Sequence, residues 1–324
     1  MKSFQEFCAC VTEEVKRRLG DGYETTLRTV RKNNNIELKG LTIRCGDTNV
    51  MPAIYLDPFY EQYSEGRTME HVVEDVIDVY RENRVPWETE PDMSPAKIRE
   101  SIQFRMVNRR MNEEEMATMP HLDFGDFSVG FQWVITTDDR RMGIVRITNE
   151  QSEEFGLDVE EMTELAIANT ERVSPPRICR IEEVISEMLS ECSSEDFAKH
   201  GKRPEEFGMP ETMFGAEDDF PMYVLTNEQR NMGASALLMI PQMDRFRERL
   251  GEDFWILPSS IHEVILIPAS RTAERDKMRQ MVQEINATQV PPQEVLADDV
   301  YLYSEFRAMV PELIRNRMQA RAAG

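Results

Sequence analysis

One short run of the chain holds the residue types that a serine hydrolase uses. Ser259, Ser260, His262 and Glu263 lie between two apolar segments with the composition of β-strands. A serine nucleophile needs a base within hydrogen-bonding distance, a third group that orients the base, and donors for an oxyanion. If the two segments pair as a hairpin, a serine approaches His262, but the alternation of side chains points Glu263 to the opposite face. The run therefore meets one of these requirements.

A structural turn is the other interpretation of this run, and we favour it. The Gly-x-Ser-x-Gly elbow of many hydrolases is missing. Two serines after Pro258 are typical of a turn in which the hydroxyls bond to the backbone. A hydrolase that uses Ser259 or Ser260 with His262, and with Glu263 nearby, remains the alternative function, and no residue is assigned a firm catalytic role.

Metal and cofactor sites leave no signature in this sequence. The chain has no His-x-x-x-His or Cys-x-x-Cys pair, and its acidic runs lack the ligand spacing and glycine of a calcium loop. The glycine spacing of a phosphate-binding loop is also missing. We therefore expect no metal and no cofactor, and we interpret the acidic runs 113–115, 217–219 and 298–299 as solvated surface.

The composition restricts the partners and the compartment. Asp and Glu total 60 against 38 Lys and Arg among 324 residues, for a formal charge of -22. Because nucleic acid is bound by neutralising its phosphates, such an acidic chain makes nucleic acid an improbable partner. The start lacks the apolar stretch of a signal peptide, and no window approaches the roughly 18 apolar residues of a membrane helix. Five cysteines without paired spacing favour reduced thiols, and we expect a cytoplasmic protein.

Residues 1–90 predict a small αβββα domain. Helical periodicity near the start is followed by three strand-like segments at 27–31, 36–44 and 50–56 and by an amphipathic helix with its stripe at 69–80. The apolar phase of the middle strand changes at Gly40, which predicts a bulge there. The same element order occurs in double-stranded-RNA-binding domains, but acidic residues cover the last helix where phosphate contacts need lysines.

The remaining chain predicts a larger domain. Prolines and acidic residues at 85–95 indicate a connector, and apolar residues at Ile98, Ile102 and Met106 predict a helix, so we expect 91–120 to be linker and connecting helix. Alternation from Phe127 to Ile135 predicts a half-buried strand. Residues 121–324 then mix helices and strands without regular βα alternation, so the predicted class is α+β with an antiparallel sheet.

Two further segments of the larger domain carry local signals. Asp158 and Glu161 have the spacing of a capping box that starts a helix running to about Val173. The polar stretch 193–221 has the composition of a long loop, which is either a lid or a surface excursion.

Several short motifs are spread over almost the whole chain: Glu37–Ile43, Tyr55–Tyr60, Val107-Asn108, Met119-Pro120-His121, Tyr223–Asn227, Leu257–Glu263 and Asn286–Val290. They resemble the motifs of domain of unknown function 5688. The family resembles a set of intracellular proteins from anaerobic Gram-positive bacteria. The resemblance implies neither an activity nor a ligand.

Polar residues within these motifs are our candidates for ligand binding. They are Asn108, His121, Thr226, Asn227, Asn286 and Gln289. Met106, Met111, Met116 and Met119 are candidates for an adaptable protein-binding groove, with core packing as the alternative. We therefore expect a non-catalytic protein- or ligand-binding module with an unknown protein or small-molecule partner. A hydrolase and RNA binding through the N-terminal domain are the alternatives.

Overall fold

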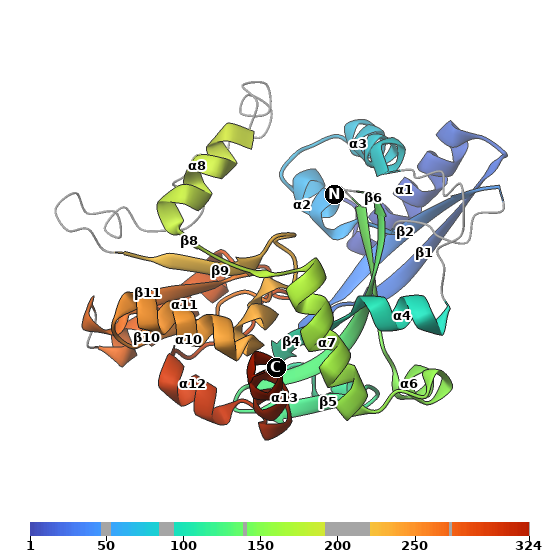
Figure 1. The fold of residues 1–324 in the computed structure, drawn as a ribbon. Coiled ribbons are helices and arrows are strands. Elements are labelled where there is room, and N and C mark those ends of the chain that lie inside the picture. Colours follow the sequence, from blue (N-terminus) through green and yellow to red (C-terminus); the bar gives the residue numbers. More distant parts are fainter. Residues whose placement is uncertain (47–52, 84–93, 139–140, 192–220, 272–273, 324) are drawn as a thin grey trace. The chain divides into compact units, whose positions relative to one another are not determined.

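The chain forms two compact units, Met1–Pro91 and Asp92–Gly324. The computed structural model describes residues 1–46, 53–83, 94–138, 141–191, 221–271 and 274–323 (Figure 1). Almost all of the expected connector 85–95 and of the polar segment 193–221 lies outside these residues. Each unit is described by itself.

The first unit has the predicted helix–strand–strand–strand–helix order, with one additional short helix. Its elements are α1 (Phe4–Leu19), β1 (Tyr23–Arg31), the 3-10 turn η1 (Asn33–Asn35), β2 (Glu37–Cys45), β3 (Ala53–Tyr55), α2 (Asp57–Ser64) and α3 (Met69–Asn83). The three strands form one antiparallel sheet in the order β1-β2-β3. Ser3 starts α1 with a capping box, because its hydroxyl accepts the Glu6 N–H and the Glu6 carboxylate accepts the Ser3 N–H.

A separate hydrophobic core lies between the helices and the sheet of the first unit. Apolar stripes of α1 and α3 pack against residues of β2 and β3 on one face of the sheet. The fully buried members are Phe7, Val11, Val15, Leu41, Leu56, Val72, Val73 and Val76. The unit therefore has a core of its own.

The expected bulge at Gly40 is wrong. The pairing of β1 with β2 is continuous from Tyr23↔Cys45 to Arg31↔Glu37, with Gly40 opposite Arg28. The change of apolar phase occurs because Leu38 lies on the outer face of the sheet, while Leu41 and Ile43 face the core. A Cβ at Gly40 would lie 3.1 Å from Val30 Cγ2, so close side-chain packing explains the glycine.

The second unit contains two antiparallel sheets, and the predicted α+β class is confirmed. The first sheet has the order β4-β6-β5, with β7 also paired to β6, and the second has the order β12-β10-β11-β9-β8. Its first half contains α4 (Pro95–Ser101), β4 (Ile102–Asn108), α5 (Glu113–Met116), β5 (His121–Phe124), β6 (Phe127–Asp138), β7 (Arg141–Arg146), α6 (Asn149–Phe155), α7 (Val159–Val173), β8 (Pro176–Arg180) and α8 (Ile181–Glu191). Its second half contains β9 (Tyr223–Asn227), η4 (Gly233–Leu238), α10 (Ile240–Leu250), β10 (Phe254–Leu257), β11 (Val264–Pro268), η5 (Ala269–Arg271), α11 (Arg275–Thr288), β12 (Tyr301–Leu302), α12 (Tyr303–Met309) and α13 (Glu312–Ala323). No helix among the described residues is long and apolar enough to cross a membrane.

The helix predicted through Ile98, Ile102 and Met106 is correct only up to Ser101. From Ile102 the chain is strand β4, which pairs with β6 over its whole length. Residues four apart share a face of a helix, but they also share a face of a strand, so the spacing was compatible with both. Residues 95–108, expected within a linker and connecting helix, thus contribute helix α4 and strand β4 to the second unit.

Strand β6 is buried on both faces along most of its length, and not half-buried as its alternation predicted. Phe127, Val129, Phe131 and Trp133 face the main core, and the small or polar residues between them are also buried. A polar side chain facing away from the main core was therefore mistaken for a solvated one.

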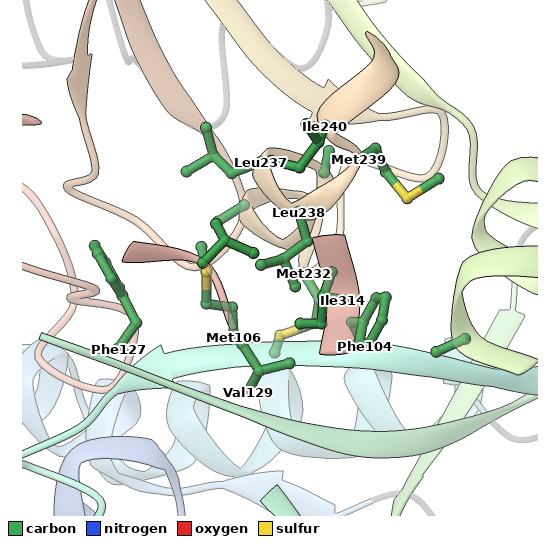
Figure 2. Close-up of a cluster of buried hydrophobic side chains, with 14 of the residues drawn as sticks. Phe104, Met106, Phe127, Val129, Met232, Leu237, Leu238, Met239, Ile240 and Ile314 are labelled. Atoms are coloured by element: carbon green, nitrogen blue, oxygen red, sulfur yellow. The ribbon is translucent and has the colours of Figure 1, made fainter. Parts of the chain in front are cut away.

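The main core of the second unit joins both sheets. Figure 2 shows Leu237 and Leu238 of η4 with Phe104 and Val129 of the first sheet in this cluster of buried side chains. Phe254 of the second sheet stacks on Tyr303 of α12 with ring centroids 4.8 Å apart. The short apolar stretch around η4 therefore fills the space where the two sheets meet.

The helix predicted from Asp158 to about Val173 is α7, but its cap is half of a capping box. The Asp158 carboxylate accepts the Glu161 N–H at 2.8 Å. The Glu161 carboxylate binds Arg99 of α4 instead of returning to the Asp158 backbone. This ion pair connects α4 to the first turn of α7.

Candidate functional site

Residues 258–263, which connect β10 to β11, form a loop that is bound to a remote segment, residues 294–298. We name these the junction loop and the partner segment. Main-chain hydrogen bonds run from Ile261 N–H to Glu294 O (2.9 Å), from Leu296 N–H to Ser259 O (3.1 Å) and from Ala297 N–H to Pro258 O (2.9 Å). The backbone of the junction loop therefore pairs almost as a strand, with an isolated bridge between Ser260 and Val295.

The Ser260 hydroxyl is buried and is used inside the junction loop. Its Oγ accepts the main-chain N–H of His262 at 3.0 Å. The same hydroxyl donates a hydrogen bond to the Glu263 carboxylate. The hydrolase hypothesis needs the Ser260 proton directed at the His262 ring. The hydroxyl instead accepts the His262 main-chain N–H and stabilises the turn. Ser259 is half-buried, and within the described residues neither serine hydroxyl is hydrogen-bonded to the His262 ring.

The imidazole of His262 is held from both sides by groups far away in the sequence. Its Nδ1 accepts the main-chain N–H of Met232 at 3.2 Å, so that the ring proton lies on Nε2. Nε2 lies 3.8 Å from Oε1 of Glu294 in the partner segment. A carboxylate does face the ring, as a catalytic triad requires, but the nitrogen that a serine would need to approach is occupied by a backbone donor.

Glu263 lies half-buried in the same loop. Burial is the largest influence on its carboxyl group and raises the pKa above the ordinary value, against the opposing effects of His262 and of the hydrogen bond from Ser260. Glu294 adds to the rise through like-charge repulsion. The junction loop and the partner segment thus bring two carboxyl groups, those of Glu263 and Glu294, near one histidine.

Thr226 and Asn227, at the end of β9, hold the chain that passes over the junction loop. Thr226 Oγ1 donates to the His262 carbonyl oxygen at 2.8 Å. The Asn227 amide both donates to the Asn231 carbonyl and accepts the Asn231 N–H. Gly233 packs closely against Thr226 and His262. A Cβ at this position would lie 2.3 Å from Thr226 Oγ1 and 2.4 Å from the His262 carbonyl oxygen, so only glycine fits.

Asn108 and Asn286 hold the partner segment from two different elements. Asn108, at the end of β4, donates from Nδ2 to the Leu296 carbonyl at 3.0 Å. Asn286 of α11 donates to the Ala297 carbonyl at 2.9 Å and to the Asp298 carboxylate at 2.7 Å. The structure therefore brings Asn108, Asn286, Thr226 and Asn227 together with the serine–histidine run around one junction, and gives each of these side chains a partner within the fold.

His121 and Gln289 do not join the junction. His121 lies on β5, where Nδ1 donates to the Met119 carbonyl at 2.8 Å and Nε2 is 3.8 Å from Asp123. Gln289 is exposed at the end of α11. In the described part of the chain, no group of three or more His, Cys, Asp or Glu side chains is placed to hold a metal ion.

The sequence reasoning missed a buried charge cluster on β4. Arg105 is 2% exposed and pairs with Glu115 of α5 at 2.6 Å, and the other carboxylate oxygen of Glu115 binds Arg146 of β7. Burial is the main cause that lowers the pKa of Arg105. Met116 and Met119 lie within 4 Å of this guanidinium. An arginine among strand residues was the signal that could have revealed the cluster.

The methionine group divides between core and surface. Met106, Met116 and Met119 are buried, and Met111 is 39% exposed. Three of the four therefore pack in the interior and are closed to a partner. This distribution favours the core-packing interpretation over a methionine groove.

A charged hollow of about 910 Å³ is the second site that the sequence reasoning missed. It lies between α10 and the region where β8 begins and β9 ends, and its lining is Pro175, Pro176, Arg177, Ile178, Glu228, Gln242, Arg245, Glu248 and Arg249. Arg245 and Arg249 are exposed, one helical turn apart, and make no hydrogen bond or ion pair among the described residues. Oε1 of Gln242 is buried and has no hydrogen-bond partner there.

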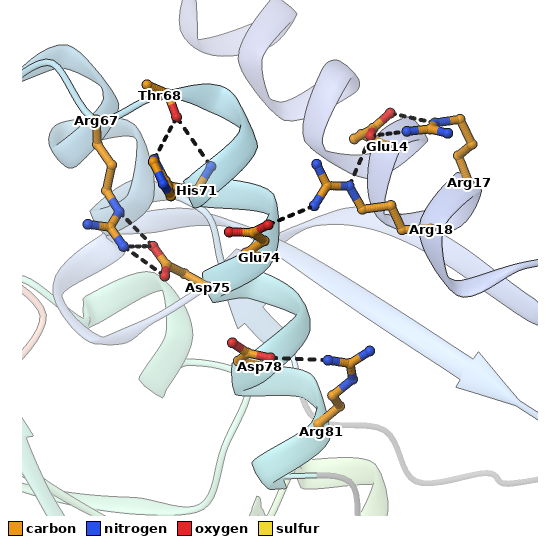
Figure 3. Close-up of polar contacts among 10 residues, drawn as sticks. All are labelled: Glu14, Arg17, Arg18, Arg67, Thr68, His71, Glu74, Asp75, Asp78 and Arg81. Atoms are coloured by element: carbon orange, nitrogen blue, oxygen red, sulfur yellow. Dashed lines mark hydrogen bonds and ion pairs between the residues drawn. The ribbon is translucent and has the colours of Figure 1, made fainter.

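The last helix of the first unit, α3, exposes acidic residues that argue against RNA binding. Glu70, Glu74 and Asp78 of α3 are exposed. Figure 3 shows Glu74 paired with Arg18 of α1, and Asp75 with Arg67. Phosphates approaching this helix would meet carboxylates and arginines that are already paired.

The fold and the junction define an α+β protein of two units, in which the conspicuous polar motifs bind other parts of the chain. The chain belongs to a family of unknown function, DUF5688, whose model matches residues 4–305. The family resemblance of the short motifs is thereby confirmed. Neither the curated proteins nor the solved structures contain a match.

Proposed function

We propose that the protein is a non-catalytic binding protein whose ligand occupies the hollow beside α10. The observation that carries the proposal is the pair of exposed arginines, Arg245 and Arg249, which open into this hollow without an ion-pair partner among the described residues. A forked guanidinium is suited to carboxylate and phosphate groups. Gln242, whose Oε1 is buried without a hydrogen-bond partner among the described residues, lines the same hollow.

The same hollow contains acidic groups, which restrict the ligand. Glu228 and Glu248 line it together with the arginines, so the site has both signs of charge. A ligand with one or two acidic groups and a hydrogen-bond donor satisfies this lining, whereas a polyanion does not. We therefore expect the site to prefer ligands with one or two negative charges over polyanions.

The hydrolase alternative receives less support from the junction loop. The Ser260 hydroxyl and both nitrogens of His262 are directed at groups of the fold.

The compartment that we propose is a reducing cytoplasm. Free thiols at Cys8, Cys10, Cys45 and Cys179 support this proposal.

The test is a thermal-shift titration of the full chain with glutamate, succinate and inorganic phosphate, with spermidine as a cationic control. We expect at least one of the anions to raise the melting temperature of the wild type, and the effect to disappear in the double variant Arg245→Ala/Arg249→Ala. The matched control is Arg279→Ala/Arg317→Ala, which removes two charges from ion pairs on other helices. Equal responses of the two variants, or no response of the wild type, would overturn the proposal.

A further inference from the structure

The outer edge of β8 borders the same hollow and offers backbone hydrogen-bonding groups. Within the described residues, β8 is the last strand of its sheet and pairs only with β9, as Figure 1 also shows. Strand edges of this kind bind extended peptides through main-chain hydrogen bonds.

The direction of the β8 backbone follows from its register. Ile181 N–H donates to the Met222 carbonyl at 3.0 Å, directly continuing the ladder between β8 and β9. Because successive residues of an antiparallel strand alternate between facing the partner and facing away, Arg177 and Cys179 face β9. The N–H and the carbonyl of Ile178 therefore point to the free edge, as does the carbonyl of Pro176.

The spacing of Arg245 and Arg249 on α10 matches the spacing of alternate side chains on a strand added beside β8. Ile178 packs with the core on the α10 face of the sheet, so a strand added beside β8 would direct alternate side chains toward α10. Alternate residues of a strand are about 6.6 Å apart. Residues one helical turn apart, such as Arg245 and Arg249, are separated by about 6 Å. Two acidic side chains at positions i and i+2 of such a strand therefore have the spacing of the two arginines.

We infer that the ligand of this site is an extended peptide that adds a strand to the free edge of β8 and places two acidic side chains, two residues apart, on Arg245 and Arg249. The inference rests on the proposed binding function of the hollow and specifies its ligand. Glu228 and Glu248, on the same lining, exclude further acidic residues. Recognition thus combines main-chain pairing with two charge contacts.

The experiment measures the fluorescence anisotropy of dye-labelled hexapeptides with the full chain at 0.15 M salt. At this ionic strength the Debye length is about 8 Å, so the local arginines decide the contact and the net charge of -22 has little influence. The first peptide has two glutamates alternating with valines, and the second has lysines in their place. Two further acidic peptides carry N-methyl groups on alternate residues, in one register or in the other. Free glutamate is the small-molecule probe, and its binding is measured by the thermal-shift titration.

We expect the acidic peptide to bind at least about tenfold more tightly than the lysine peptide. One N-methylated register should lose binding and the other should keep it, because an added strand uses the N–H groups of one side only. Arg245→Glu/Arg249→Glu should weaken binding about tenfold or more, and Arg279→Glu/Arg317→Glu should not. Ile178→Pro, which removes an outward N–H and leaves the ladder with β9 intact, should also weaken it.

The possible failures separate the inference from the proposed function. Equal binding of both N-methylated peptides, or of the lysine peptide, overturns strand addition. Binding of free glutamate that depends on Arg245 and Arg249, without peptide binding, also overturns the inference but supports the proposed function. Absence of binding by every peptide overturns the inference, and absence of binding by glutamate, succinate and phosphate as well contradicts the proposed function too. Ile178→Pro is accepted as a test only with an unchanged circular dichroism spectrum, and the methylated peptides decide the matter on the wild type.

Discussion

The Nδ1 atom of His262 accepts the main-chain N–H of Met232 at 3.2 Å, across 30 residues of sequence. Met232 has a left-handed backbone conformation with φ 54°, which is uncommon for a residue with a long side chain. The histidine therefore stabilises a strained position in the chain that crosses the junction loop. This relationship gives the most conspicuous histidine of the sequence a structural role.

Replacement of His262 tests that role. His262→Ala leaves the Met232 N–H without its acceptor, and we expect the free energy of unfolding to fall by about 1–3 kcal/mol. His262→Asn should cost less, because the amide oxygen is as far from Cα as Nδ1 is. Urea unfolding followed by tryptophan fluorescence measures both variants. Equal losses in the two variants would contradict a role for the Nδ1 acceptor.

The buried cluster of Arg105, Glu115 and Arg146 predicts an asymmetry between its members. Glu115→Gln leaves two arginines facing a neutral amide, and we expect a loss of about 3–5 kcal/mol in the free energy of unfolding. Arg105→Met keeps the pair of Glu115 with Arg146 and should cost less. Chemical denaturation of both variants provides the comparison, and the reverse order would show that Arg105 is the essential member.

Glu263 predicts a dependence of stability on pH. Its pKa is raised in the folded state, mainly by burial, from an ordinary value of 4.5. The folded protein therefore binds this proton more tightly than the unfolded chain, so the contribution to stability is complete below about pH 4.5 and is lost as the pH rises through the folded pKa. Glu263→Gln should be more stable than the wild type at neutral pH, with a smaller difference near pH 4. Melting temperatures across this range measure the effect, and a difference that is independent of pH would contradict it.

Gly233 predicts a severe effect of a single methyl group. Gly233→Ala places a Cβ 2.3 Å from Thr226 Oγ1 and 2.4 Å from the His262 carbonyl, and we expect a loss of about 3 kcal/mol or more. Gly143→Ala is the matched control, because the nearest atom to its Cβ is 3.6 Å away, and it should change stability by less than about 0.5 kcal/mol. Thermal unfolding of the two variants decides whether the close approach at Gly233 is required.

The first unit is expected to fold by itself. Residues 1–91 have a core formed by α1, α3 and the three-stranded sheet. A fragment that ends at Pro91 should therefore show helical circular dichroism, a cooperative thermal transition and dispersed amide resonances. A fragment with the spectrum of an unfolded chain would mean that the unit depends on the rest of the protein.

Local periodicity was sufficient for the elements that expose one face. The stripes of α1 and α3 predicted amphipathic helices, and the antiparallel segments of the first unit were located to within a few residues. Periodicity predicted the wrong element at β4 and, although it located strand β6, the wrong burial there, because both faces of these strands are buried. Gln103, Arg105, Ser128 and Gln132 lie on the face opposite the main core. Alternation of apolar and polar residues looks the same in the sequence whether the polar side chains are buried or solvated.

The candidate site divides in the same way. The sequence by itself determined the α+β class, the family and the run of serine, histidine and glutamate, because these depend on residue types within a few positions. Only the tertiary structure placed Met232 and Glu294 on His262, Asn108 and Asn286 on the partner segment, and the arginines of α10 beside the free edge of β8. These contacts join residues tens of positions apart, and their geometry depends on how the sheets and helices pack, which no local pattern of residues encodes.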